Sequence, residues 1–98
     1  DGIKVEGDIR SNKGVRLGEN AVVYGNVFAE GDIYMGKNSR ILGNVFTQAS
    51  FKAEEGAVVG QRGKIKSLIA RDKVTFYKNS LVYGYIECHD IGNVLGEE

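Results

Sequence analysis

The chain has 98 residues, which indicates one small domain over residues 1–98, and its 13 Lys and Arg balance its 13 Asp and Glu. The zero net charge argues against nucleic acid as a partner, because phosphate binding requires a basic face. The single cysteine, Cys88, excludes an internal disulfide and favours a reducing, cytoplasmic compartment, and no apolar run approaches the ~20 residues that span a bilayer.

A short motif returns along the first half of the chain at a constant interval. Its copies are Val5-Glu-Gly-Asp-Ile9, Val23-Tyr-Gly-Asn-Val27 and Ile41-Leu-Gly-Asn-Val45, which begin 18 residues apart. A fixed short period is typical of a solenoid, in which each repeat buries its apolar face only against the next repeat. The alternation within each copy predicts one half-buried strand. The predicted fold class is therefore all-β: a single-stranded parallel β-helix, or β-solenoid, with about five coils of roughly 18 residues.

Two further features repeat in register after each motif. The inward positions of a second strand recur every 18 residues, as Val15, Ile33 and Phe51, and again as Leu17, Met35 and Ala53. A small residue closes each of four coils, at Ala21, Ser39, Ala57 and Ser80, directly after Asn20, Asn38, Gly56 and Asn79. Asn and Gly tolerate a positive φ best, so we expect a left-handed corner at these positions.

The fourth coil departs from the period. The pattern of a first strand returns with Ile65 and Ile69 as inward residues, but Ile65 follows Ile41 by 24 positions. In solenoids an insertion maps to a loop at a corner. We therefore expect an inserted corner loop near residues 59–64, which is either a partner-binding element or a tolerated surface insertion. The loop residues singled out for binding are Gln61 and Arg62.

The last coil contains the only cysteine and the only histidine of the chain, the two side chains best suited to metal binding or nucleophilic catalysis. Val82, Gly84 and Ile86 repeat the first strand, and Cys88 follows in the inward phase. Adjacent side chains of a strand point to opposite faces, so Cys88 and His89 are not expected to form a metal site or a nucleophile and base pair. Because His89 is the only histidine, we expect no metal, no cofactor and no catalytic residue, and Cys88 is interpreted as a core residue.

Apolar side chains also occupy outward positions of the first strands. An exposed, in-register apolar face of this kind usually marks an interaction site, although part of the chain could instead cover it. We predict a lateral or partner-binding face from six residues: Val22, Tyr24, Phe28, Leu42, Phe46 and Tyr83.

Both ends of the repeat remain apolar, and neither carries a recognisable cap. An uncapped solenoid leaves unpaired strand edges and an exposed slice of core, which favour addition of a further copy. The predicted end-to-end interface comprises Ile3, Val5 and Ile9 at one end and Val82, Ile86, Ile91 and Leu95 at the other.

With these features in place, the sequence resembles the bactofilins, a polymer-forming family of the bacterial cytoskeleton. The resemblance rests on residues 5–9, 17–27, 35–45 and 82–86. It implies a right-handed, three-sided β-helix that polymerises end to end without nucleotide and performs no catalysis. It also implies a cytoplasmic scaffold, able to lie at the inner face of the cell membrane, whose partners are itself and envelope or motility proteins, with no small-molecule substrate.

Two alternatives stay open at this point. Residues 17–22 and 35–40 resemble the hexapeptide of left-handed β-helix acyltransferases, and 18 is three times six. Only one sextet in three fits that pattern, however, since Gly25 and Gly43 stand where the pattern expects no glycine. The other alternative is a discrete rod-shaped adaptor whose partner covers the apolar lateral face.

Overall fold

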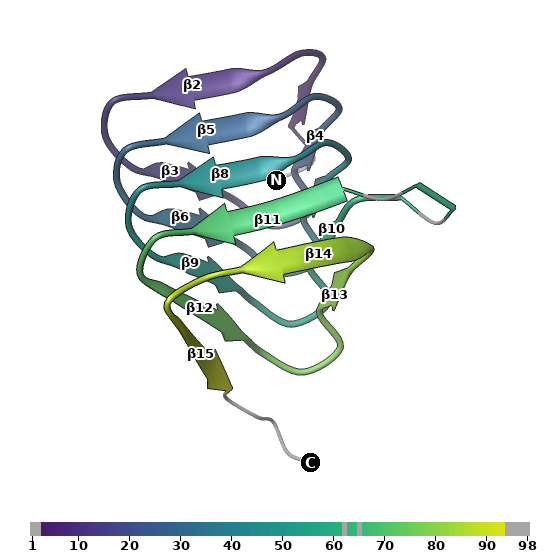
Figure 1. Cartoon of the computed structure of the whole chain (residues 1–98). Coiled ribbons are helices and arrows are strands. Elements are labelled where there is room, and N and C mark those ends of the chain that lie inside the picture. The colour runs from purple at the N-terminus through teal and green to yellow at the C-terminus, as the bar shows by residue number, and fades with distance from the viewer. Residues whose placement is uncertain (1–2, 62, 65, 94–98) are drawn as a thin grey trace.

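The computed structural model describes residues 3–61, 63–64 and 66–93. Within these ranges fifteen β-strands form three parallel sheets of five strands each. Successive coils of the chain lie on top of one another around a common axis, as Figure 1 shows. The predicted all-β solenoid, with about five coils and three sides, is confirmed.

Each coil contributes one short strand to each sheet. Sheet A contains β1 (Lys4–Val5), β4 (Val22–Val23), β7 (Arg40–Ile41), β10 (Val58–Val59) and β13 (Leu81–Val82). Sheet B contains β2 (Ile9–Ser11), β5 (Val27–Ala29), β8 (Val45–Thr47), β11 (Lys66–Ala70) and β14 (Gly84–Glu87). Sheet C contains β3 (Val15–Leu17), β6 (Ile33–Met35), β9 (Phe51–Ala53), β12 (Lys73–Phe76) and β15 (Asp90–Asn93).

The chain winds around its axis with a right hand. In Figure 1 the strands of sheet B cross the near side from right to left, and the chain returns behind them as it descends towards the C-terminal coil. Right-handed connections are the rule between parallel strands, because each strand has a right-handed twist. The handedness implied by the family resemblance is therefore observed, and it is opposite to that of the left-handed hexapeptide acyltransferases.

Over the first three coils the register places each residue beside the one 18 positions later. Ile33 pairs with Val15 on one side and with Phe51 on the other, as the sequence pattern predicted. The inward columns form a narrow core, in which Val23, Val27 and Ile41 are fully buried. Burial of a Val, Ile, Leu or Phe side chain stabilises a fold by roughly 1.5–3 kcal/mol, so this column of side chains holds the three sheets together.

The predicted first strand of each coil is wrong in one respect, because it is two strands and not one. The chain bends at Gly25 in the second coil and at Gly43 in the third, so that β4 and β7 belong to sheet A while β5 and β8 belong to sheet B. A Cβ atom at Gly43 would collide with the carbonyl oxygen of Gly25 in the coil above. Glycine therefore allows the coils to approach at this corner.

The left-handed corner predicted from Asn and Gly is confirmed. Asn20, Asn38 and Asn79 have φ values of 63°, 60° and 63°, and Gly56 has a φ of 77°. The small residue that follows lies inside the corner: Ser39 is fully buried and its hydroxyl donates a hydrogen bond of 2.7 Å to the carbonyl oxygen of Gly36. Complete burial of Ser39 is consistent with the small residue that the sequence repeats at this position.

A ladder of side-chain hydrogen bonds follows the corner between sheets A and B. Asp8 Oδ1 accepts the backbone N–H of Asn26 at 2.8 Å, and Asn26 Oδ1 accepts that of Asn44 at 2.6 Å. Asn44 Oδ1 then accepts the backbone N–H of Ser67 at 2.8 Å. Each rung satisfies a backbone donor that the strands leave unpaired at the bend, which explains why short polar residues follow each glycine of the motif.

The fourth coil corrects the predicted phase. Val59 is buried in β10 and pairs with Ile41, and Leu68 is buried in β11 and pairs with Val45. Ile69 pairs with Phe46 and therefore points outward, whereas the sequence pattern placed it inward; Ile65 lies outside the described residues. Nine positions separate Val59 from Leu68, against four between Ile41 and Val45, so this corner holds five additional residues that begin after Val59.

Substitution of Asn38 tests the left-handed corner. Asn38→Ala should lower the free energy of unfolding by about 1 kcal/mol, because a Cβ-bearing residue without a short polar side chain is strained at positive φ. Asn38→Gly should retain most of the stability, because glycine adopts this conformation freely. Thermal unfolding followed by circular dichroism measures both variants, with Lys37→Ala as the exposed neighbouring control. Equal losses in the two Asn38 variants would contradict the backbone explanation.

Substitution of two glycines tests the close approach of the coils. Gly43→Ala should destabilise the fold by about 1–3 kcal/mol, the usual cost of overpacking, because the new Cβ atom meets the backbone of the coil above. In the described part of the chain no heavy atom beyond the adjacent residues lies within 4 Å of a Cβ atom built at Gly18, so Gly18→Ala should be close to neutral. Unfolding in urea compares the two, and similar stabilities would disprove the steric explanation.

Candidate functional site

The N-terminal end of the solenoid exposes one edge of each sheet. β1, β2 and β3 are the terminal strands of sheets A, B and C, and among the described residues no strand pairs with their outer edges. The inward side chains of Val5 and Ile9 continue the core columns but are only partly buried, in contrast to the fully buried Val23 and Val27 directly below them. Ile3 precedes these strands and is 64% exposed.

In the part of the chain that the structure describes, the C-terminal end shows the same incompleteness. β13, β14 and β15 are the opposite edge strands of the three sheets. Ile86 lies in the same inward column as Leu68, yet it is 38% exposed whereas Leu68 is fully buried. Val82 is partly buried against the core, and the backbone of Ile91 pairs with Val74 in sheet C. Of the predicted end residues only Leu95 lies outside the described residues.

The six residues predicted as one lateral face do not share one face. Val22 lies on sheet A, whereas Phe28 and Phe46 pair with each other on sheet B. The remaining three lie at the corners between these sheets, outside the strands: Tyr24, Leu42 and Tyr83. They spread over sheet A, its corner and sheet B because the chain bends at the glycine of the motif, whereas the sequence pattern treated the motif as one straight strand; their role in binding stays a prediction. Only Tyr24 is strongly exposed, at 46%, and the other five are half-buried.

Cationic and aromatic side chains stack on the outer faces near the N-terminal end. The Arg10 guanidinium lies 5.1 Å from the ring centre of Phe28, and that of Arg16 lies 4.3 Å from the ring centre of Tyr34. Each such pair stabilises an exposed site by roughly 0.5–1 kcal/mol. Of the aromatic residues in the predicted lateral face, Phe28 is the one on which such a cation stacks among the described residues.

A small polar network surrounds Tyr34 on sheet C. Its hydroxyl donates a hydrogen bond of 2.9 Å to Glu54. Burial raises the pKa of Tyr34 above its usual value, and the bond to Glu54 acts in the same direction. The pKa of Lys52 is also raised, chiefly by its hydrogen bond with Tyr77. Both groups therefore keep their ordinary protonation states at neutral pH, which does not suit them to act as a general acid or base there.

The additional residues of the fourth coil form a projection between β10 and β11. Figure 1 shows it leaving the body of the solenoid at the corner between sheets A and B. Gln61 and Lys64 form an antiparallel bridge within it, and Gly60 and Gly63 have φ values of 93° and 84°. Gln61 is half-buried and Arg62 lies outside the described residues, so their predicted role in binding stays a prediction.

The two candidate reactive side chains of the last coil occupy different environments. Cys88 is a free thiol that is partly buried against the core, and His89 is exposed at a bend. Within residues 3–61, 63–64 and 66–93, no group of three or more His, Cys, Asp or Glu side chains is arranged to hold a metal ion. The same ranges contain no helix of the length and hydrophobicity needed to cross a membrane.

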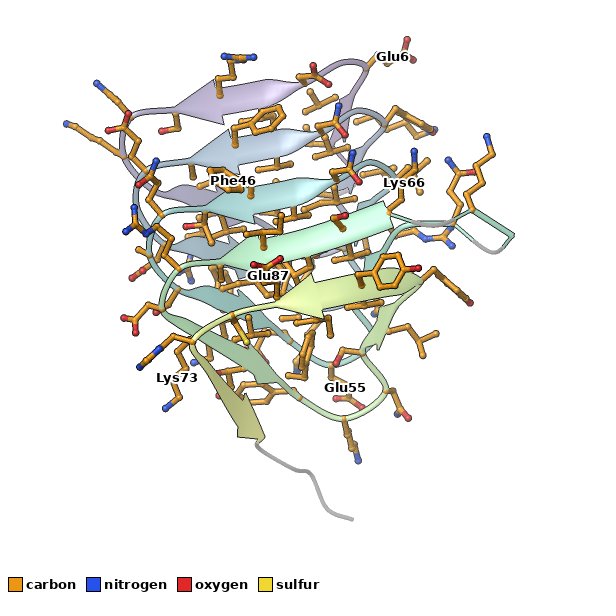
Figure 2. The ribbon with its side chains drawn as sticks, in the orientation of Figure 1. Glu6, Phe46, Glu55, Lys66, Lys73 and Glu87 are labelled. Atoms are coloured by element: carbon orange, nitrogen blue, oxygen red, sulfur yellow. The ribbon has the colours of Figure 1, made fainter. Side chains whose placement is uncertain are left out.

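The sequence reasoning missed the charge pattern along the outer columns, because among the outward residues it compared only the apolar ones. Register places Arg10, Phe28, Phe46, Ile69 and Glu87 in one outward column of sheet B. Figure 2 shows Phe46 and Glu87 on that face. The 18-residue spacing of Arg10, Phe28 and Phe46 was a signal that could have revealed the first part of this column.

Comparisons of the chain with models of known protein families, with curated proteins and with solved structures gave no match.

Proposed function

We propose that this protein is a non-catalytic scaffold that polymerises end to end into filaments without nucleotide, as its sequence resemblance to the bactofilins implies. The observation that carries the proposal is the pair of solenoid ends at which, among the described residues, no strand pairs with the outer edges of the three sheets. Each end presents three strand edges and an incompletely buried slice of the same apolar core. A second copy of the chain, placed on either end, would provide hydrogen-bonding partners for the strand edges and would bury the exposed core, as a further coil would.

The contact between the first two coils indicates how strong such a joint can be. Outside the strand ladders, eight backbone hydrogen bonds join these two coils. At a net 0.5–1.5 kcal/mol for each bond, this is about 4–12 kcal/mol. The estimated cost of bringing two molecules together is about 4–15 kcal/mol. Burial of Val5, Ile9, Val82 and Ile86 adds to the favourable side, so a complete coil-to-coil joint is sufficient for assembly without an energy source.

Self-assembly also suits the charge of the chain. The net charge is zero at neutral pH, so long-range repulsion between copies is weak. In cells such a filament would position other proteins along its length, and the outer faces and the projection at Gln61–Lys64 are where such partners would bind. The cytoplasm, including the inner face of the cell membrane, is the location that the proposal implies.

Charged substitutions at the ends test the proposal. Ile86→Lys and Val5→Lys should each convert long filaments into short or soluble species, because an ammonium group would be buried without a partner in the joint. Negative-stain microscopy of the purified protein in plain buffer, together with light scattering, measures the change. Circular dichroism must show that the variants remain folded, which Ile86 favours because it is already 38% exposed.

Tyr24→Lys is the matched control, because Tyr24 is exposed at a lateral corner and not at an end. It should leave filament length unchanged. Filaments of normal length from both end variants would contradict assembly through the ends. A monomer or dimer that does not grow with concentration would indicate the adaptor instead, and a discrete trimer that releases heat on titration with coenzyme A would indicate the acyltransferase.

A further inference from the structure

Sheet B carries an apolar stripe on its outer face. Phe28, Phe46 and Ile69 follow one another in register on β5, β8 and β11. All three side chains are half-buried, so part of each remains open to solvent. In Figure 1 sheet B faces the viewer, and no segment of the described residues passes in front of it. The stripe is therefore accessible to another molecule.

Polar groups border this stripe on both sides. On the side of sheet A lies the ladder of side-chain hydrogen bonds, whose oxygens already accept backbone N–H groups. On the side of sheet C lie the exposed residues Glu30, Gln48 and Arg71, and the Arg71 guanidinium donates a hydrogen bond of 3.3 Å to Gln48 Oε1. A groove of about 350 Å³ opens between this polar edge and the rings of Phe28 and Phe46. The apolar surface is thus one residue wide, which suits a single partner segment.

Opposite charges mark the two ends of the stripe. Arg10 precedes Phe28 in the column, and its guanidinium lies 5.1 Å from the centre of that ring. Glu87 follows Ile69 on β14 and is exposed. Figure 2 shows Glu87 on the same face as Phe46. Four coil steps of ~4.8 Å separate Arg10 from Glu87, so the two charges lie roughly 19 Å apart along the solenoid axis.

The spacing of the stripe matches an α-helix laid along the axis. One helical turn rises about 5.4 Å, and successive coils are ~4.8 Å apart. Apolar side chains placed once per turn would therefore meet Phe28, Phe46 and Ile69 in succession, with a mismatch of roughly 1 Å over three coils. An extended strand repeats its face every ~6.7 Å, and a polyproline helix every ~9.3 Å, so neither meets three consecutive coils.

The backbone of sheet B also argues against a strand as the partner. Added strands bind through free backbone groups at a sheet edge. β5, β8 and β11 each pair with a neighbouring strand on both sides, so the outer face over them offers side chains and no backbone partners. Recognition there must come from side-chain contacts, as it does when an amphipathic helix binds in an apolar groove.

We propose that the outer face of sheet B binds an amphipathic α-helix of a partner protein, which lies along the solenoid axis. About 13 residues at 1.5 Å per residue span the distance between Arg10 and Glu87. Acidic side chains are favoured in the first turn of a helix and basic side chains in the last. The N-terminus of the partner helix therefore lies at Arg10 and its C-terminus at Glu87, where each charge meets its opposite.

This inference rests on the proposed scaffold function and specifies the chemistry of the proteins that the scaffold positions. A contact between one short helix and one stripe is small, and small interfaces are typical of weak, transient complexes. A filament repeats the stripe once in every copy, so partners that carry several such helices would gain avidity from it. Isolated partner helices would exchange rapidly.

Peptide binding tests the inference. The probe is a fluorescein-labelled, helix-stapled peptide of about 14 residues, with leucine once per turn, glutamate in the first turn and lysine in the last. Fluorescence anisotropy should show saturable binding to filaments of the full chain. Phe46→Gln and Ile69→Gln should each weaken binding about tenfold, because each removes one of the apolar contacts without changing the charge. Circular dichroism checks that both variants are folded.

Val58→Gln is the matched control. Val58 is an outward, half-buried aliphatic residue like Ile69, but it lies on sheet A between Arg40 and Leu81. Its substitution should leave peptide affinity unchanged. An equal loss in Val58→Gln and in the two sheet B variants would overturn the assignment to this face.

Reversal of charge tests the direction of the helix. A peptide with lysine in the first turn and glutamate in the last should bind the natural chain about fivefold more weakly. The same peptide should be preferred by the double variant Arg10→Glu with Glu87→Lys, which exchanges the two charges of the column. Equal binding of both peptides to both chains would overturn the role assigned to Arg10 and Glu87.

The remaining outcomes separate this inference from the proposed assembly. Normal filaments that bind no peptide would overturn the inference alone, whereas a chain that binds the peptide but forms no filaments in micrographs would support the site and contradict the assembly. Equal binding of an unstapled peptide with a central proline would overturn the helix in favour of an extended segment. Without peptide binding, loss in Phe46→Gln of lateral filament bundles would assign the face to a second copy, and loss of binding to phosphatidylglycerol vesicles would assign it to a lipid surface.

Discussion

The structure depends on backbone hydrogen bonds between parallel strands of successive coils. Because these bonds fix one residue directly above its equivalent 18 positions later in the first three coils, each side chain is surrounded by side chains of its own column. The side chains of one column must therefore fit one another in size and polarity. Valine and isoleucine can fill the inside, while a glycine is needed wherever two coils approach too closely for a Cβ atom.

Polar side chains are subject to the same rule. Asp8, Asn26 and Asn44 each accept a backbone N–H from the coil below, so that the bend between sheets A and B remains hydrogen-bonded at several levels. In the fourth coil the chain leaves the corner and returns, and β11 then pairs with β8 as if the five additional residues were absent. The insertion is tolerated because corner residues lie outside the ladders that hold the coils together.

A fold built by repetition does not determine its own length. The interactions that attach the fifth coil to the fourth are of the same kind as those that would attach another copy of the chain. Partial exposure of Val5 and Ile86, whose column neighbours are fully buried, is the local sign of this incompleteness.

Much of the fold followed from the sequence. The 18-residue period, the inward columns and the positive φ at Asn20, Asn38 and Asn79 could be predicted, since each depends on residue type and on a local spacing that repeats. The positions of Val5 and Ile9 in the first coil and of Val82 and Ile86 in the last could be predicted for the same reason, whereas their role in assembly stays a prediction.

The tertiary structure alone decided where the motif bends, which phase the fourth coil adopts and which residues share an outer face. From the sequence alone Gly25 is compatible with a continuous strand, and only its close approach to the coil above shows why a glycine is needed there. Leu68 and Ile69 are both apolar, so only their pairing with Val45 and Phe46 shows which of them points inward. Likewise, the position of Arg10 and Glu87 in one outward column depends on a strand register that continues past the insertion. These features arise from contacts between coils. The period of the sequence indicates that such contacts exist, but it does not determine which side chains face each other in them.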